Sequence, residues 1–142
     1  MTITFLGAPT GGAKLVPSYS FRVPAGFPSP ASDHLEKIIS LDELFDLRAP
    51  HVYLVKVEGD SMQGAGIFSG DVVIVDRGRD AEHGDIIIAA VNNEPVCKRL
   101  HRRAGAVILK SENPAYPARY ILEGDDFLVW GVVRFSVRDH AQ

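Results

Sequence analysis

The 142-residue sequence has little cysteine, no long apolar run and no excess of positive charge. Its single cysteine, Cys97, excludes a disulfide within the chain and fits a reducing compartment. No apolar run approaches the roughly 18 residues of a membrane helix, and residues 1–12 lack the pattern of a signal peptide. A net charge of −3 gives no support for a nucleic-acid-binding surface. We therefore expect a cytoplasmic protein that neither enters a membrane nor binds nucleic acid directly.

The composition is typical of one ordinary globular domain. The sequence is 46% hydrophobic and 23% charged, and it is long enough to bury a single sizeable core. It contains no internal repeat and no low-complexity segment. Nothing in the sequence calls for a metal ion or a cofactor, and we expect neither.

Residues 1–28 are interrupted by four glycines and four prolines, a spacing that favours neither helix nor regular strand. We expect an extended N-terminal arm. Short helices are predicted next, because Ser29-Pro30 matches a helix start and Leu35, Ile38 and Ile39 fall on one helical face. A second short helix is expected after Ser40, which has capping-box spacing to Glu43, and it should end before Pro50.

From residue 51 onward the sequence predicts strands separated by turn signals. Asn92-Asn93 is a good hairpin turn, because asparagine tolerates positive φ angles. Short loops without a β-α-β rhythm favour a mostly-β fold, a small coiled or barrel-like sheet preceded by the arm and the short helices. The expected strands are Val52–Val57, Val72–Val75, Asp85–Val91, Pro95–His101, Val107–Lys110, Tyr120–Leu122 and Leu128–Val137.

The stretch Gly59-Asp60-Ser61-Met62 follows the first of these strands. Gly59 permits a sharp exit from the strand, and a serine held at such a turn can expose its hydroxyl. The backbone N–H of Ser61, together with that of Asp60 or Met62, is a candidate oxyanion hole. An ordinary turn is the alternative, because a serine becomes a nucleophile only when a base lies within hydrogen-bond reach.

Lys98 is the preferred base for Ser61. Alternation places it on the same strand face as Val96 and Leu100, where burial would lower its pKa. A lysine of ordinary pKa is neutral only about 0.04% of the time at pH 7, so such a shift is needed for catalysis. Cys97 faces the other side of the strand and is excluded from this site. The sequence also leaves open a Ser-His-Asp triad with one of the histidines 34, 51, 83, 101 and 140.

Taken together, these motifs resemble the LexA/UmuD family of self-cleaving serine peptidases, peptidase S24. The resemblance covers about residues 22–137, and the matching elements occur in family order. They are Ala25-Gly26-Phe27-Pro28-Ser29-Pro30-Ala31, Gly59-Asp60-Ser61-Met62, Gly66-Ile67 to Gly70-Asp71, Val72 to Asp76, His83-Gly84-Asp85 to Val91, Val96-Cys97-Lys98-Arg99-Leu100, Asn113-Pro114-Ala115-Tyr116-Pro117 and Trp130-Gly131-Val132-Val133.

The resemblance implies an arm over residues 1–28 and a LexA- or signal-peptidase-like peptidase domain over residues 29–142. It implies that Ser61 is the nucleophile, that Lys98 is the general base and that the bond cut is Ala25–Gly26 in this chain. Cysteine is common at position 25 in UmuD-type members, whereas alanine is the LexA-type residue.

Only 25 residues precede Gly26, where LexA-like repressors have a helix-turn-helix domain, so we expect a UmuD-type member. That branch implies a role in SOS mutagenesis. Cleavage would be stimulated by a RecA–single-stranded-DNA filament, and the processed homodimer would join a UmuC-type Y-family polymerase as DNA polymerase V in translesion synthesis. Two alternatives remain, a LexA-fold dimerisation or regulatory module without peptidase activity and a signal-peptidase-like Ser/Lys endopeptidase.

Overall fold

The computed structural model describes residues 1–9, 15–19, 35–47 and 49–141. The chain forms two compact units, Met1–Pro9 with Pro50–Gln142 and Thr10–Ala49. The expected division after residue 28 differs from this one, because strand β1 (Thr2–Gly7) pairs with β4 (Val52–Glu58) in the larger unit. Residues 2–7 therefore belong to a sheet and not to an extended arm.

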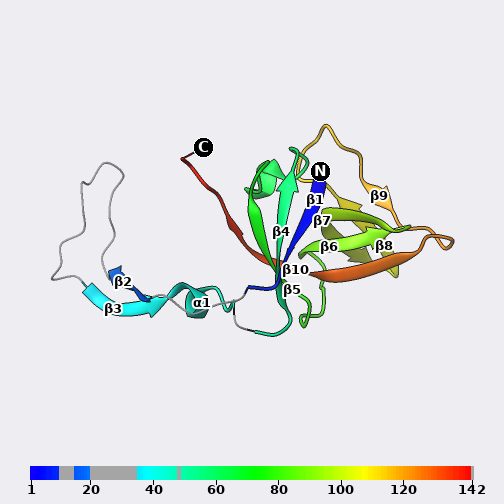
Figure 1. Cartoon of the computed structure of the whole chain (residues 1–142). Coiled ribbons are helices and arrows are strands. Elements are labelled where there is room, and N and C mark those ends of the chain that lie inside the picture. The colour runs from blue at the N-terminus through cyan, green and yellow to red at the C-terminus, as the bar shows by residue number, and fades with distance from the viewer. Residues whose placement is uncertain (10–14, 20–34, 48, 142) are drawn as a thin grey trace. The chain divides into compact units, whose positions relative to one another are not determined.

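The larger unit is one antiparallel sheet of eight strands in the order β1-β4-β5-β10-β6-β7-β8-β9 (Figure 1). Strand β1 also approaches β7, five places away in that order, so the sheet curls on itself. The mostly-β, coiled-sheet prediction is confirmed. The remaining strands are β5 (Val72–Asp76), β6 (Ile86–Val91), β7 (Glu94–Arg103), β8 (Ala106–Lys110), β9 (Arg119–Tyr120) and β10 (Phe127–Val137).

All seven strands expected from the sequence occur, with ends that differ by at most two residues. The predicted hairpin between β6 and β7 is also present. Asn92 and Asn93 adopt φ angles of 50° and 66°, the paired positive values that a tight two-residue hairpin turn requires. Alternation and turn chemistry were sufficient signals here, because the strands other than the two-residue, exposed β9 have buried residues on at least one face.

The described residues of the smaller unit form a two-stranded antiparallel sheet and one short helix. Strand β2 (Leu15–Tyr19) pairs with β3 (Leu35–Ser40), and helix α1 (Leu41–Leu44) follows. The helix predicted through Leu35, Ile38 and Ile39 is therefore wrong. Pairing with a segment about twenty residues earlier overrides the local spacing, and isoleucine itself favours strands. The expected start at Ser29-Pro30 lies outside the described residues.

The cap predicted at Ser40 is confirmed. Its hydroxyl oxygen accepts hydrogen bonds from the backbone N–H groups of Asp42 at 3.1 Å and Glu43 at 3.4 Å. These are amides that have no partner within the first turn of a helix. The cap at Ser40 was predicted correctly, whereas the helix before it was not, because a cap depends only on residues that are neighbours in sequence.

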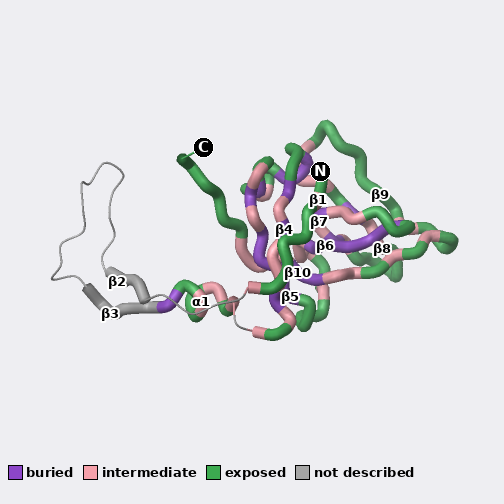
Figure 2. The backbone as a smooth tube through the Cα atoms, in the orientation of Figure 1, coloured by how far each residue is buried: buried purple, intermediate pink, exposed green. Residues whose placement is uncertain are grey.

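Two apolar clusters form the interior of the larger unit, and β6 contributes to both. Ile88 belongs to the first cluster, whereas Ile87, Ala89 and Val91 belong to the second, so both faces of β6 are buried (Figure 2). The first cluster is Val55, Val57, Met62, Ile67, Val73, Val75, Ile88 and Cys97, and the second is Ile87, Ala89, Val91, Leu100, Leu109 and Val132.

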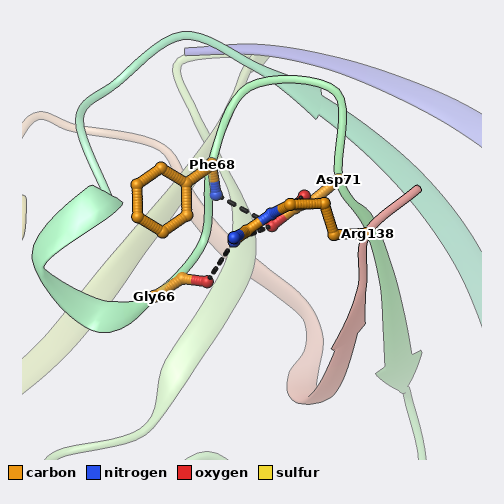
Figure 3. Close-up of polar contacts among 4 residues, drawn as sticks. All are labelled: Gly66, Phe68, Asp71 and Arg138. Atoms are coloured by element: carbon orange, nitrogen blue, oxygen red, sulfur yellow. Dashed lines mark hydrogen bonds and ion pairs between the residues drawn. The ribbon is translucent and has the colours of Figure 1, made fainter. Parts of the chain in front are cut away.

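An ion pair fixes the loop between the Ser61 turn and β5. Arg138, just after β10, donates from Nε to Asp71 Oδ1 at 2.9 Å and from Nη2 to Asp71 Oδ2 at 3.0 Å and to the Gly66 carbonyl at 3.0 Å (Figure 3). Its guanidinium also lies 4.0 Å from the centroid of the Phe68 ring. The Asp71 side chain is only 1% exposed, so this carboxylate depends on its partners.

We expect Arg138→Ala to lower the free energy of unfolding by about 1–3 kcal/mol at neutral pH, because it leaves Asp71 with the Phe68 N–H as its remaining partner. The hydrogen bond from Arg138 lowers the pKa of Asp71 in the folded state. The stabilisation that the Asp71–Arg138 ion pair gives to the folded state is therefore complete above the pKa of Asp71 in the unfolded chain, near 3.9. It is lost as pH falls through the lower pKa of Asp71 in the folded state.

Urea titrations at several pH values check this expectation. The difference in unfolding free energy between wild type and Arg138→Ala should become smaller below about pH 4. The control Arg103→Ala removes an exposed arginine and should stay within about 0.5 kcal/mol of wild type. A difference that is constant from neutral to acid pH would contradict the role given to Asp71.

Candidate functional site

The turn that carries Ser61 begins where β4 ends. Gly59 adopts a φ of +110°, and a Cβ at this position would lie 3.0 Å from the Cα of Met1, so glycine is required both for conformation and for space. Met62 is fully buried in the first apolar cluster, as expected of a side chain packed beneath the loop. The turn is therefore held by its own core residue on one side and by the N-terminal strand on the other.

Ser61 itself is fully buried, and its Oγ forms no hydrogen bond to any described residue. A buried hydroxyl without a partner is uncommon and calls for an explanation. The N–H groups of Asp60, Ser61 and Met62 likewise donate to no described residue. The turn thus places an unbonded hydroxyl beside unbonded amides, the arrangement that the expected nucleophile and oxyanion hole require.

Lys98 lies on β7, half-buried, with its ammonium directed at a second serine. Lys98 Nζ donates a hydrogen bond to Ser111 Oγ at 2.5 Å and lies 5.9 Å from the centroid of the Tyr116 ring. Burial lowers the pKa of Lys98, and the neighbouring Cys97 opposes that shift. Burial also raises the pKa of the Cys97 thiol to about 12, which keeps it protonated and unreactive.

Residues Ser111–Tyr116, which we call the bridging segment, contact both the Ser61 turn and the Lys98 strand. The Glu112 carbonyl accepts from the N–H of Gly64 at 2.8 Å, and the Asn113 amide donates to the Asp60 carbonyl at 2.9 Å. The Tyr116 hydroxyl donates to the Asp60 carboxylate at 2.5 Å, and this bond raises the pKa of Tyr116. One segment therefore positions the two proposed catalytic residues.

The histidine alternative receives no support from the described residues. His51 pairs with Asp76 at 3.4 Å, and His83 accepts from the backbone N–H of Arg102 and packs against His101. No described histidine is hydrogen-bonded to Ser61. His34 lies outside the described residues, as do Ala25 and Gly26, the expected cleavage site.

A groove of about 410 Å³ lies beside Lys98. Its walls are mainly apolar, and its charged members besides Lys98 are Glu94 and Arg119. The full lining is Val91, Glu94, Val96, Lys98, Leu109, Tyr116, Pro117, Ala118 and Arg119. A larger apolar hollow of about 720 Å³ around Phe5, Tyr53 and Trp130 contains neither Ser61 nor Lys98.

Two further observations concern the described residues alone. They contain no group of three or more His, Cys, Asp or Glu side chains placed to hold a metal ion. They also contain no helix with the length and apolar character needed to cross a membrane.

Comparison with known proteins assigns the family. The family model described as Peptidase S24-like matches residues 17–134. The chain belongs to the S24-like peptidases. Members of this SOS-related family are serine peptidases that cleave themselves.

The curated relatives of this S24-like chain include proteins of similar and of greater length. Protein MucA of Salmonella typhimurium is 36% identical over 126 residues, which cover 88% of this chain and 86% of MucA. Protein SamA of the same species is 38% identical over 82% of this chain and 81% of SamA. The LexA repressor of Bordetella parapertussis is 38% identical over 89% of this chain, but the match spans only 58% of the repressor.

Ser111, Asn113 and Tyr116 were not assigned roles from the sequence. A local signal for Ser111 was present in the Ala104-Gly105 turn, where both residues adopt positive φ angles and join β7 to β8. Such a two-residue turn fixes the register of the hairpin, with Arg99 opposite Lys110. Just beyond that pair, Ser111 accepts a hydrogen bond from Lys98 Nζ. The bonds from Asn113 and Tyr116 to Asp60 join residues more than fifty positions apart and have no local signal.

We expect Gly64→Ala to separate the bridging segment from the Ser61 turn. A Cβ at Gly64 would lie 2.5 Å from the Glu112 carbonyl oxygen, and backbone must move to relieve that contact. The expected loss of unfolding free energy is about 1–3 kcal/mol, measured by urea titration. The matched control is Gly124→Ala, where a Cβ meets nothing within 4 Å and should change stability by less than about 0.5 kcal/mol. Equal effects of the two substitutions would contradict this packing.

Proposed function

We propose that this S24-like chain cleaves its own Ala25–Gly26 bond with Ser61 as nucleophile and Lys98 as general base. The observation that carries the proposal is that the bridging segment is bonded both to Lys98 and to Asp60, the neighbour of Ser61, while the Ser61 hydroxyl is buried and unbonded and burial lowers the pKa of Lys98. Family membership supplies the reaction class.

In the first step, neutral Lys98 takes the proton of Ser61 as the serine oxygen attacks the Ala25 carbonyl carbon. The N–H of Ser61, with that of Asp60 or Met62, stabilises the oxyanion. The Gly26 amine leaves with the proton returned by Lys98, and an ester links Ala25 to Ser61. Lys98 then takes a proton from a water molecule as the water oxygen attacks the ester carbonyl. The bond to Ser61 breaks, Lys98 returns the proton to the serine oxygen, and the Ala25 carboxylic acid ionises to the carboxylate.

The groove beside Lys98 supports a peptide substrate made of this chain. Val96 and Leu109 give it apolar walls that suit an extended segment, and Ala25 and Gly26 are small enough for close approach to a serine. Ser61 does not line this groove and has no exposed surface, so cleavage needs a local rearrangement before attack. This requirement favours a slow cleavage reaction that occurs once per molecule and that an activator accelerates.

The resemblance to UmuD-type members extends the proposal to partners. A RecA–single-stranded-DNA filament stimulates cleavage in the cytoplasm by favouring the reactive conformation. The processed homodimer then joins a UmuC-type Y-family polymerase in translesion synthesis after DNA damage. The chain itself needs no metal or other cofactor for the peptidase step and makes no direct contact with nucleic acid.

The test is self-cleavage of the purified protein across a pH series. The rate should rise with pH and then level off, because only neutral Lys98 accepts the proton of Ser61. Ser61→Ala and Lys98→Ala should each lower the rate more than about a thousandfold. Mass spectrometry should place the new N-terminus at Gly26.

Three outcomes distinguish the alternatives. A chain that stays intact at pH 10, with and without RecA filament, would overturn the peptidase proposal and favour a dimerisation module. Cleavage of an added signal-peptide substrate would favour a signal-peptidase-like enzyme. Cleavage that persists in Lys98→Ala would remove Lys98 from the mechanism, whatever its pKa.

A further inference from the structure

Lys98 has a hydrogen-bond partner in this structure, and that partner is not Ser61. Its Nζ donates to Ser111 Oγ at 2.5 Å, whereas Ser61 Oγ is bonded to no described residue. We propose that Ser111 is a positioning residue for Lys98, holding the amine so that its lone pair points toward Ser61. This inference rests on the proposed function, because it concerns the base of that reaction.

The bonding of a neutral lysine amine explains how a single hydrogen-bond acceptor can orient its lone pair. A neutral lysine amine has two N–H donors and one lone pair, and only the lone pair can take the proton of Ser61. When Ser111 Oγ accepts one N–H, rotation about the last side-chain bond is restricted. The long lysine side chain otherwise has several rotamers of similar energy, so one fixed acceptor reduces the loss of entropy on reaching the reactive geometry.

The position of Ser111 is itself over-determined. Ser111 directly follows β8, whose last residue, Lys110, pairs with Arg99 of β7, so the hairpin brings Ser111 beside Lys98. The next residue, Glu112, is fixed twice, by an ion pair with Arg99 and by its carbonyl bond to Gly64. The backbone is therefore held on both sides of Ser111, by the Arg99–Lys110 pair before it and by the contacts of Glu112 after it.

Other groups near Lys98 do not supply the same contact. Tyr116 offers its ring face while its hydroxyl is engaged by Asp60, and Cys97 faces the first apolar cluster. Glu94 and Arg119 line the same groove, but neither forms an ion pair or hydrogen bond with Lys98 among the described residues. Ser111 is the side chain that accepts from Nζ in the described structure.

The test compares Ser111→Ala with Ser111→Thr, which keeps the hydroxyl, and with Ser136→Ala, an exposed serine on β10. In Ser111→Ala the alkaline plateau of self-cleavage should fall about tenfold, because the amine is no longer oriented. The midpoint of the pH–rate profile should move about one unit lower, because an acceptor that favours the charged ammonium is lost. Ser111→Thr and Ser136→Ala should keep the wild-type midpoint.

A second readout does not depend on cleavage. The Lys98 side chain can be titrated by NMR in the full-length Ser61→Ala protein, with its signals assigned through Lys98→Arg. Adding Ser111→Ala should lower the Lys98 midpoint by the same amount, whereas a merely structural serine would affect thermal stability and leave the midpoint in place.

The outcomes separate this inference from the proposed function. The role of Ser111 would be overturned if Ser111→Ala left the NMR midpoint of the Lys98 titration unchanged, or if Ser111→Ala and Ser111→Thr lost cleavage equally. Either result would leave the Ser61–Lys98 mechanism intact. A wild-type chain that never cleaves would overturn the proposed function, and the NMR titration would still decide whether Ser111 holds Lys98.

Discussion

The register of the β7–β8 hairpin is the constraint on which the candidate site depends. The tight turn at Ala104-Gly105 aligns Arg99 with Lys110, and Ser111, the residue after Lys110, then lies within hydrogen-bond distance of Lys98. The chain then continues directly into the bridging segment, whose backbone and side chains contact Gly64 and Asp60. Because β7 is also paired with β6, a slip of one residue between β7 and β8 would leave Lys98 in place and turn Ser111 to the other side of the sheet, away from Lys98 Nζ.

The curled sheet and the site support each other through shared core residues. Met62, next to Ser61, and Cys97, next to Lys98, both pack into the first apolar cluster. Two buried side chains thus fix the backbone beside Ser61 and Lys98, the proposed nucleophile and base. Burial that stabilises the fold also lowers the pKa of Lys98, the shift that the proposed base requires.

Strands with a regular polar–apolar alternation and clear turn residues could be predicted closely, because those signals are local. The Ser40 cap was predictable for the same reason. The helix expected around Leu35 and Ile38 was wrong, since apolar residues at helical spacing can equally occupy a strand once a distant partner is available. The strand at Thr2–Gly7 was missed, because its pairing with β4 involves residues some fifty positions later.

By itself the sequence determined the fold class, the family motifs around Ser61 and Lys98, and the hairpin turn that sets the register between β7 and β8. Only the tertiary structure decided how deeply Ser61 is buried, that its hydroxyl has no partner among the described residues, and that Lys98 donates to Ser111. It also decided that Asp60 is held by Asn113 and Tyr116. Local sequence patterns reflect propensity and periodicity. Burial and long-range hydrogen bonds depend on which distant segments the curled sheet brings together.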